Sequence, residues 1–422
     1  MTNLSMGLLA ALQLLTNLAL QVVVLSIVGV GASTDAYVAA QAVPLLLISV
    51  LATSLQNVWQ PRLAVLNNDI AARGAAQRLA LGQAVIIFGV PVLLLLLCSP
   101  IWVKLLFPGF SLAQVSLTVT MTQVLLVASF FNGHASLLTT FQRSRDRFVG
   151  PELAQLIAFI VAIAAVVPAL QVFGIGAVPW VILARSIVVC LVLYVMAERP
   201  AISPLEVLKK RDLWPGTAVL MAGSSIYKTG PLVDRFWISM APAGSVTVYN
   251  LVQIGMNALA IVLDRAICVP AAPTLARFAQ ARDFTGLRRL YRQCVRRTIY
   301  AVIALPLLLV AIHPFWPTLA GAVLKVSPEF AEQMWVLSFM LLGYLIVAGC
   351  GYAVMASFYA MGDMRTPVTI GVAGFLVGVV LKSAAFLQIG ITGLAIATSA
   401  YYVLNLVVLI LLLEKRIRDE VS

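Results

Sequence analysis

The sequence predicts an all-α, polytopic membrane protein with twelve transmembrane helices in two six-helix halves around a central cavity. The first observation is composition, since 62% of the 422 residues are hydrophobic and only 10% are charged. A soluble chain of this length could not bury so much apolar surface. The second observation is a series of apolar runs long enough to cross a bilayer. The third is a similarity between the two halves of the chain.

Each expected span is an apolar run of about 20 residues. The first run has no basic segment before it, so we interpret it as a retained helix and not as a cleaved signal peptide. The twelve expected spans cover residues 5–30, 36–60, 80–103, 113–139, 151–170, 176–197, 214–239, 245–270, 297–319, 331–360, 366–386 and 391–413.

Basic residues are distributed unevenly between the expected connections. Alternate connections, together with the adjoining span ends, contain 21 of the 28 Lys and Arg residues, whereas the intervening connections contain only Lys104 and Lys325. Because basic residues accumulate on the cytoplasmic side, both termini are expected in the cytoplasm. The net charge of +12 therefore follows from membrane topology, and no nucleic-acid partner is predicted.

The second half of the chain repeats part of the first at an offset of 212 residues. This offset pairs Tyr37 with Tyr249, Gln41 with Gln253 and Pro61 with Pro273. A weaker pair, Asp146 and Asp363, has each Asp five residues after a Phe. Parallel repeats are typical of transporters whose halves rock around a cavity, so we expect halves at residues 1–212 and 213–422. Chance similarity between apolar helices is the alternative.

The sequence lacks the motifs of several pump and enzyme classes. There is no GxxxxGK[ST] loop to bind nucleotide phosphates, so an ATP-driven pump is not predicted. Every expected outer connection is short, whereas membrane glycosyltransferases, polymerases and ligases generally carry a large outer loop with catalytic residues. We therefore predict that the protein is not an enzyme and needs no cofactor. No metal site is predicted either, because no metal-ligand spacing relates the five cysteines, which are Cys98, Cys190, Cys268, Cys294 and Cys350.

Five short stretches of the chain are distinctive. They are GVGASTDAYVAAQAVP at 29–44, WQPRLA at 59–64, VDRFW at 233–237, GSVTVYN at 244–250 and FYAMGDMRTPV at 358–368. Together they resemble the MviN/MurJ-like flippases of the multidrug/oligosaccharidyl-lipid/polysaccharide exporter superfamily, and the last stretch is the most specific. The resemblance runs along most of the chain.

The resemblance implies a flippase that moves a polyprenyl-pyrophosphate-linked glycolipid across the bacterial cytoplasmic membrane. The glycolipid would be lipid II or a related cell-envelope oligosaccharide precursor, and the bilayer and cell-envelope biosynthesis proteins are the other implied partners. Typical members have fourteen spans, and they carry arginine near the positions of Leu14, Leu20, Ile48 and Ser49. The alternative is a cation-coupled multidrug antiporter of the same superfamily, which would need a buried carboxylate such as Asp264.

Charged residues inside the expected spans are few. A charge there costs about 2.5–3.5 kcal/mol on insertion scales, so each one marks a candidate functional position. Apart from Glu152 and Glu332 at span ends, they are Asp35, Arg185, Lys228, Asp234, Arg235, Asp264, Arg265 and Lys382. Arg binds phosphate as a planar fork and Lys binds it as a point charge. We therefore expect Lys228, Arg235 and Arg265 to bind the pyrophosphate, and Arg185 and Lys382 are the next candidates.

Amide side chains form rows at helical spacing in two expected spans. The eighth span carries Asn250, Gln253 and Asn257 with Asp264 on one face, and the first span carries Gln13, Asn17 and Gln21. Amides both donate and accept hydrogen bonds, as sugar hydroxyls require, so we predict that these rows contact the glycan. Interhelical hydrogen bonding, worth about 0.6 kcal/mol on average, is the alternative.

Asp35 lies at the expected start of the second span. A carboxylate at this position accepts hydrogen bonds from free backbone N–H groups and complements the helix dipole. Its counterpart in the repeat is Thr247, so the cap recurs but the charge does not. The functional alternative is that Asp35 and Asp264 take part in gating or coupling. A further alternative is an ion pair between Asp35 and Arg235.

Overall fold

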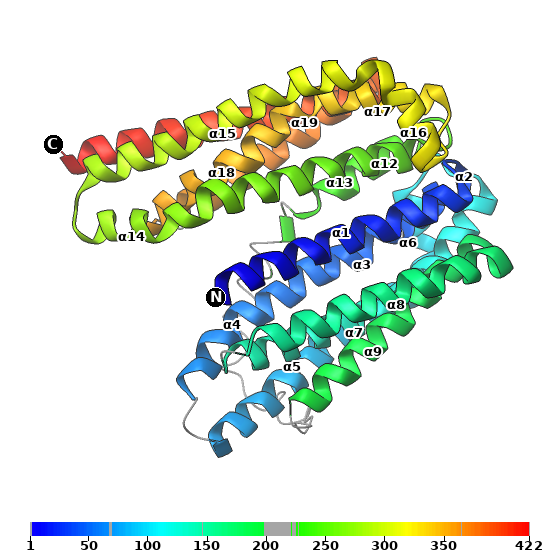
Figure 1. The fold of residues 1–422 in the computed structure, drawn as a ribbon, viewed down its shortest axis with the longest axis horizontal. Helices are drawn as coiled ribbons and strands as arrows, with labels where there is room; N and C mark the ends of the chain where they lie inside the picture. The colour runs from blue at the N-terminus through cyan, green and yellow to red at the C-terminus, as the bar shows by residue number, and fades with distance from the viewer. Residues whose placement is uncertain are drawn as a thin grey trace. The chain divides into compact units, whose positions relative to one another are not determined.

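The computed structural model describes residues 2–66, 70–145, 147–197, 221, 225–226, 228–363 and 365–421. Every regular element in these ranges is a helix, which confirms the predicted all-α fold. The chain forms two compact units, Met1–Gly244 and Ser245–Ser422 (Figure 1). The predicted boundary after residue 212, residues 214–220, 222–224 and 227 of the span expected at 214–239, and Asp146 lie outside the described residues. The division into six-helix halves therefore stays a prediction.

One long helix, α7, organises the N-terminal unit. The elements of this unit are α1 (Thr2–Val28), α2 (Ala32–Ala40), α3 (Ala42–Leu47), η1 (Ile48–Ala52), α4 (Thr53–Val65), α5 (Ile70–Leu97), α6 (Ser99–Leu106), α7 (Leu112–Arg143), α8 (Val149–Phe173), η2 (Gly174–Ala177), α9 (Val178–Met196) and α12 (Gly230–Ile238). Helix α7 packs against α2, α5 and α9, and α1 packs against α8 (Figure 1).

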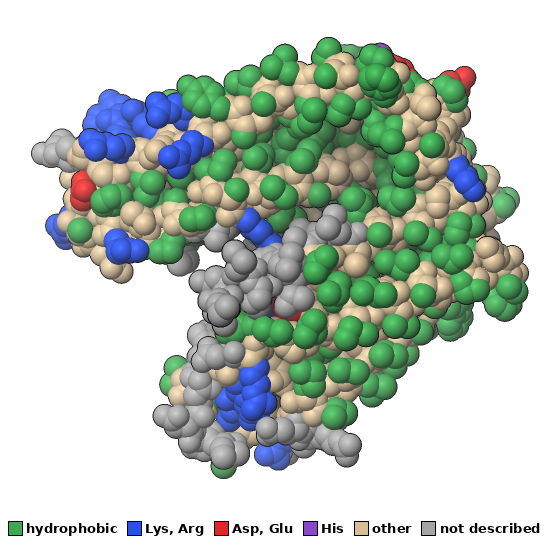
Figure 2. Space-filling model, in the orientation of Figure 1, with side chains coloured by type: hydrophobic (Ala, Val, Ile, Leu, Met, Phe, Trp, Pro, Cys, Tyr) green, Lys and Arg blue, Asp and Glu red, His purple; other side chains and the backbone are tan. Residues whose placement is uncertain are grey.

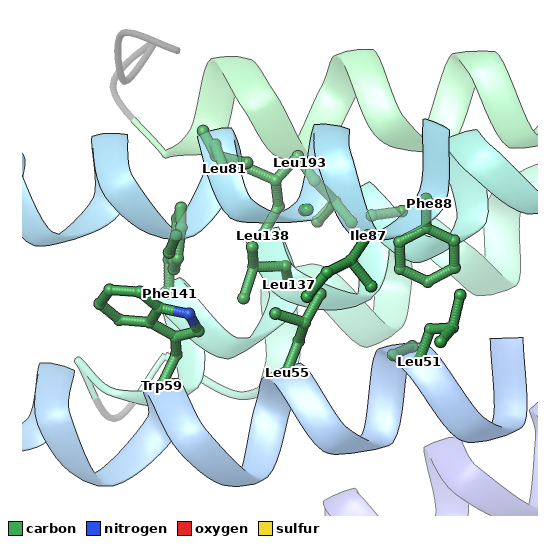
Figure 3. Close-up of a cluster of buried hydrophobic side chains, with 14 of the residues drawn as sticks. Leu51, Leu55, Trp59, Leu81, Ile87, Phe88, Leu137, Leu138, Phe141 and Leu193 are labelled. Atoms are coloured by element: carbon green, nitrogen blue, oxygen red, sulfur yellow. The ribbon is translucent and has the colours of Figure 1, made fainter. Parts of the chain in front are cut away.

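A buried hydrophobic cluster joins α4, α5, α7 and α9 (Figure 3). Its labelled side chains are Leu51, Leu55, Trp59, Leu81, Ile87, Phe88, Leu137, Leu138, Phe141 and Leu193. The Trp59 indole N–H donates to Gln83 Oε1 at 2.8 Å, so its polar atom is satisfied within the cluster. On α7, Gly133 admits the Phe88 ring, because a Cβ at this position would lie 2.3 Å from a ring carbon.

The C-terminal unit is built from helices that pack mainly on α18. Its elements are α13 (Ser245–Leu263), η4 (Asp264–Cys268), η5 (Val269–Ala271), α14 (Ala272–Gln280), α15 (Phe284–Ile312), η6 (His313–Phe315), α16 (Trp316–Leu324), α17 (Pro328–Met340), α18 (Leu342–Ala360) and α19 (Arg365–Val421). Helix α18 contacts α13, α14, α15 and α19. Buried Leu287, Tyr291, Cys350 and Phe358 lie at the centre of one of its hydrophobic clusters.

Both units contain a π-helical turn in the stretches that the sequence repeat pairs. In the N-terminal unit the turn is η1, between α3 and α4, and in the C-terminal unit it is η4, directly after α13. Their first residues, Ile48 and Asp264, are 216 positions apart, close to the offset of 212 in the sequence. Such single turns are frequent at functional sites, because they displace side chains and backbone carbonyls from the regular helix.

Eight described segments are long and apolar enough to cross a membrane. Two of them are Val149–Met196, with 48 residues, and Arg365–Glu420, with 56. A straight helix of 48 residues would be about 72 Å long, against about 30 Å for the hydrocarbon core. Gly174 and Gly390, with φ of 65° and 66°, break these two segments where consecutive spans were expected to meet. The count of twelve spans is not established by these segments and stays a prediction.

The surface of the helices is apolar over much of its area, as a lipid-facing surface requires (Figure 2). Basic side chains instead gather at one end of the C-terminal unit, around the start of α15 and the end of α19 (Figure 2). There Glu414 pairs with Arg288 and Arg292 at 2.6 Å, and Asp363 pairs with Arg416. Three segments that the sequence assigns to the cytoplasm therefore meet at the same end of this unit.

Candidate functional site

Asp35 is buried in the first turn of α2, with 2% of its surface exposed. Its carboxylate accepts a hydrogen bond of 2.6 Å from the backbone N–H of Gly244, within the N-terminal unit. At the start of α2 the side chain of Thr34 accepts from the backbone N–H of Gly31 at 2.9 Å. A backbone donor for Asp35 was expected, but this donor lies after α12 and not in the first turn of α2.

Lys228 reaches the π-helical turn of the N-terminal unit, where its ammonium donates to the backbone carbonyl of Ser49. Seven residues further along, Arg235 lies in α12 directly after the buried side chain of Asp234. The resemblance placed a family arginine near Ile48 and Ser49, and in this chain a cation reaches that turn from a different part of the sequence.

The amide row of α1 divides between two roles. Gln13 Nε2 donates to Glu152 Oε2 at 2.7 Å, and Glu152 also pairs with Arg143 at 2.6 Å. This hydrogen bond joins α1 to α8, as the packing alternative expects. Gln21 Nε2 donates to Gln41 Oε1 at 3.3 Å. The side chain of Asn17 is not among those that the structure describes.

The row in the C-terminal unit follows α13 and ends in η4. The side chains of Asn250 and Gln253 are half-buried, and Asn257 is exposed while its amide oxygen accepts from the Tyr344 hydroxyl. Within η4, Arg265 is exposed, whereas the Oδ1 atom of Asp264 is buried without a hydrogen-bond partner among the described residues. The structure thus brings the row together on one helix but does not test its role.

A cavity of about 390 Å³ lies inside the N-terminal unit. Side chains from α1, α2, α3, η1, α4, α7, α8 and α9 line it, and they include the predicted Gln21 and the second-rank candidate Arg185. The Arg185 guanidinium stacks on Phe159, with 4.0 Å between its Cζ atom and the ring centre. Two guanidinium groups, Arg143 and Arg185, lie in the wall, and no carboxylate does so among the described lining residues.

Most polar residues of the cavity wall were not singled out from the sequence. On α7 the row Asn132, Ser136, Thr139 and Arg143 faces the cavity. Its spacing of 4, 3 and 4 is the same one-face pattern that identified the other rows. Because serine and threonine often bond to the preceding turn of their own helix, this row is a weaker sequence signal than a row of amides.

The fold and this polar interior define a polytopic membrane transporter. A family model described as "Lipid II flippase MurJ" matches residues 24–420. The chain belongs to the MurJ lipid II flippase family. No functionally curated protein matches the chain.

Solved structures share this fold at low sequence identity. A lipid II flippase MurJ in an inward closed conformation has a TM-score of 0.81 at 14% identity, covering 97% of this chain and 87% of that one. An inward-facing multidrug resistance MATE family transporter of the MOP superfamily has a TM-score of 0.78 at 17% identity, covering 97% and 95%. A MOP superfamily transporter from Pyrococcus furiosus has a TM-score of 0.67 at 16% identity, covering 99% and 94%.

Proposed function

We propose that this protein translocates a polyprenyl-pyrophosphate-linked glycolipid across the bacterial cytoplasmic membrane by alternating access. The substrate class is lipid II or a related cell-envelope oligosaccharide precursor. The observation that carries this proposal is the match of the MurJ family model over residues 24–420. Both termini would face the cytoplasm, because the basic connections and the two chain ends fall on the same side of the expected spans.

The substrate has a pyrophosphate and a glycan, and the predicted residues suit these two parts separately. Lys228, Arg235 and Arg265 would contact the pyrophosphate, because charge-assisted hydrogen bonds to phosphate are the stronger kind. Amides such as Gln21 and Gln253 would contact sugar hydroxyls. Asp35 and Asp264 would take part in gating, and the hydrogen bond between Asp35 and Gly244 supports a role that couples two segments.

A cation-coupled multidrug antiporter is the second candidate, and the MATE structure with a TM-score of 0.78 favours it. A cationic drug requires a carboxylate in the binding cavity. The cavity of the N-terminal unit has two arginines and no carboxylate among its described lining residues, which supports an anionic substrate instead.

Depletion of the protein in its own host tests the proposed function. We expect lipid-linked precursor to accumulate in the inner leaflet, because synthesis continues while translocation stops. Labelling of outer-leaflet glycolipid in spheroplasts measures this, with a re-expressed wild-type copy as the control. Unchanged precursor pools together with increased sensitivity to cationic drugs would favour the antiporter.

A further inference from the structure

The cavity inside the N-terminal unit contains buried polar groups without hydrogen-bond partners among the described residues. They include the Tyr37 hydroxyl, Gln41 Nε2 and Arg185 Nε, and none of these three makes a hydrogen bond of ordinary length within the part of the chain that the structure describes. All three residues line the cavity. Tyr37 is 1% exposed, so its hydroxyl is removed from bulk water. Buried polar groups are normally hydrogen-bonded, and each exception requires an explanation.

Several neighbouring polar groups in the same wall are already paired, and a fourth atom without a hydrogen bond, Arg143 Nε, belongs to a guanidinium that pairs with Glu152 through Nη2. Gln56 Nε2 donates to Ser136 Oγ at 2.5 Å, and Asn132 Nδ2 donates to Ser186 Oγ at 2.9 Å. Arg143 is neutralised by Glu152 at 2.6 Å. The cavity wall therefore contains amide side chains held by hydrogen bonds, together with a few donor groups that make none.

Arg185 gives the cavity its charge. It lies within α9, far from either end, and no described carboxylate pairs with it. An unpaired cation inside a span is costly, so it marks a functional position. The stack on Phe159 fixes the plane of the guanidinium, and a fixed fork suits phosphate oxygens.

We propose that this cavity binds the phosphorylated sugar end of a lipid-linked glycan, with Arg185 as a phosphate contact in addition to Lys228, Arg235 and Arg265, and with Tyr37 and Gln41 as further donors. The volume of about 390 Å³ is within the usual range for a small-ligand site. The polar wall suits a phosphate and a sugar and not a polyprenyl chain. This proposal rests on the proposed function, and it adds Arg185, Tyr37 and Gln41, all within the N-terminal unit, to the residues that would contact the headgroup.

Binding to the purified full-length protein in nanodiscs tests the proposal with two probes, inorganic pyrophosphate and lipid II. Arg185→Gln should weaken binding of both probes by roughly ten- to a hundredfold, because it removes a charge-assisted hydrogen bond. Tyr37→Phe should weaken it by roughly two- to tenfold. Tyr37→Phe removes only a hydroxyl that makes no hydrogen bond of ordinary length among the described residues, so the variant should fold normally.

Arg62→Gln is the matched control. The Arg62 guanidinium also lies over an aromatic ring, 5.4 Å from the centre of Trp59, but its side chain is exposed and does not line the cavity. This variant should bind both probes as the wild type does.

Two results would overturn the proposal. Wild-type affinity for both probes in the Arg185→Gln and Tyr37→Phe variants would remove the cavity from the substrate path. Weaker binding of pyrophosphate with unchanged binding of lipid II would show a site for free anions only. Failure of the proposed function is a separate observation, namely a wild-type protein that translocates no polyprenyl-linked glycolipid.

Discussion

The carboxylate of Asp35 accepts a hydrogen bond of 2.6 Å from the backbone N–H of Gly244, 209 residues later in the chain. Gly244 has a φ of 99°, a conformation that residues with a Cβ rarely adopt. A buried carboxylate needs hydrogen-bond donors, and this backbone N–H is one of them. The contact therefore ties the first turn of α2 to the segment that follows α12.

Replacement of Asp35 should separate its structural role from its charge. Asp35→Ala leaves the Gly244 N–H without this acceptor, so the protein should lose roughly 1–3 kcal/mol of stability. Asp35→Asn retains an acceptor oxygen and should lose less. Thermal unfolding in detergent measures both variants. An Asp35→Asn protein that is stable but inactive in transport would support gating, whereas full stability of Asp35→Ala would contradict the structural role.

A methyl group at Gly133 should destabilise the N-terminal unit. Its Cβ would lie 2.3 Å from the ring of Phe88, which is fully buried. Overpacking of this kind costs about 1–3 kcal/mol. The control is Gly74→Ala, because Gly74 is in a helix, exposed and free of neighbours within 4 Å. That control should gain about 0.5–1 kcal/mol, and equal melting temperatures for the two variants would contradict the packing argument.

Asp363 should make the stability of the C-terminal unit depend on pH. Burial raises the pKa of this carboxyl, but hydrogen bonds from the Thr366 N–H at 3.0 Å and hydroxyl at 2.7 Å, together with Arg416, hold the pKa below its usual value. The native pKa is thus lower than the unfolded one of about 3.9. The stabilisation is present above the unfolded pKa and disappears as the pH falls through the native pKa.

Melting temperatures of the wild type and Asp363→Asn, measured from pH 7 down to pH 3, check this prediction. The difference between the two proteins should be largest near neutral pH and should shrink at the acidic end. A difference that stays constant over the whole range would show that the carboxylate charge at Asp363 does not contribute.

The helices of this fold could be predicted from the sequence, because hydropathy and glycine positions act locally. Apolar runs located α8 and α9, and the break between them falls at Gly174, whose positive φ ends the first helix. The most specific stretch, residues 358–368, includes the end of α18 and the start of α19, and between them Gly362 has a φ of 76°. Asp363 accepts the first free N–H groups of α19 there.

The candidate site was harder to predict, because it depends on which helix faces meet. Periodicity shows that Gln13 and Gln21 share a face of α1, but it does not show that Gln13 bonds to Glu152 while Gln21 lines a cavity. Similarly, nothing local to Lys228 indicates that its ammonium reaches the carbonyl of Ser49. Tertiary packing selects among the polar residues that the sequence alone treats alike.

Lys228 provides the last prediction, since it is the predicted phosphate contact with a defined neighbour. Its ammonium donates to one backbone carbonyl in η1, and no carboxylate is recorded as its partner among the described residues. Lys228→Ala therefore leaves no buried carboxylate unpaired, and membrane abundance should stay near that of the wild type. If Lys228 binds pyrophosphate, affinity for lipid II should fall roughly ten- to a hundredfold. Lys104→Ala, at an exposed position in α6, is the control and should change neither quantity.

Loss of abundance without loss of affinity in the remaining protein would instead assign Lys228 to the support of the π-helical turn. Because that turn lies beside the cavity, through Ile48 in its wall, a lysine that only stabilised it would still affect binding indirectly. Lys228→Arg distinguishes the two roles. An arginine retains a donor for Ser49 and keeps the turn, whereas its planar guanidinium does not replace the point charge of an ammonium, so affinity should change while abundance does not.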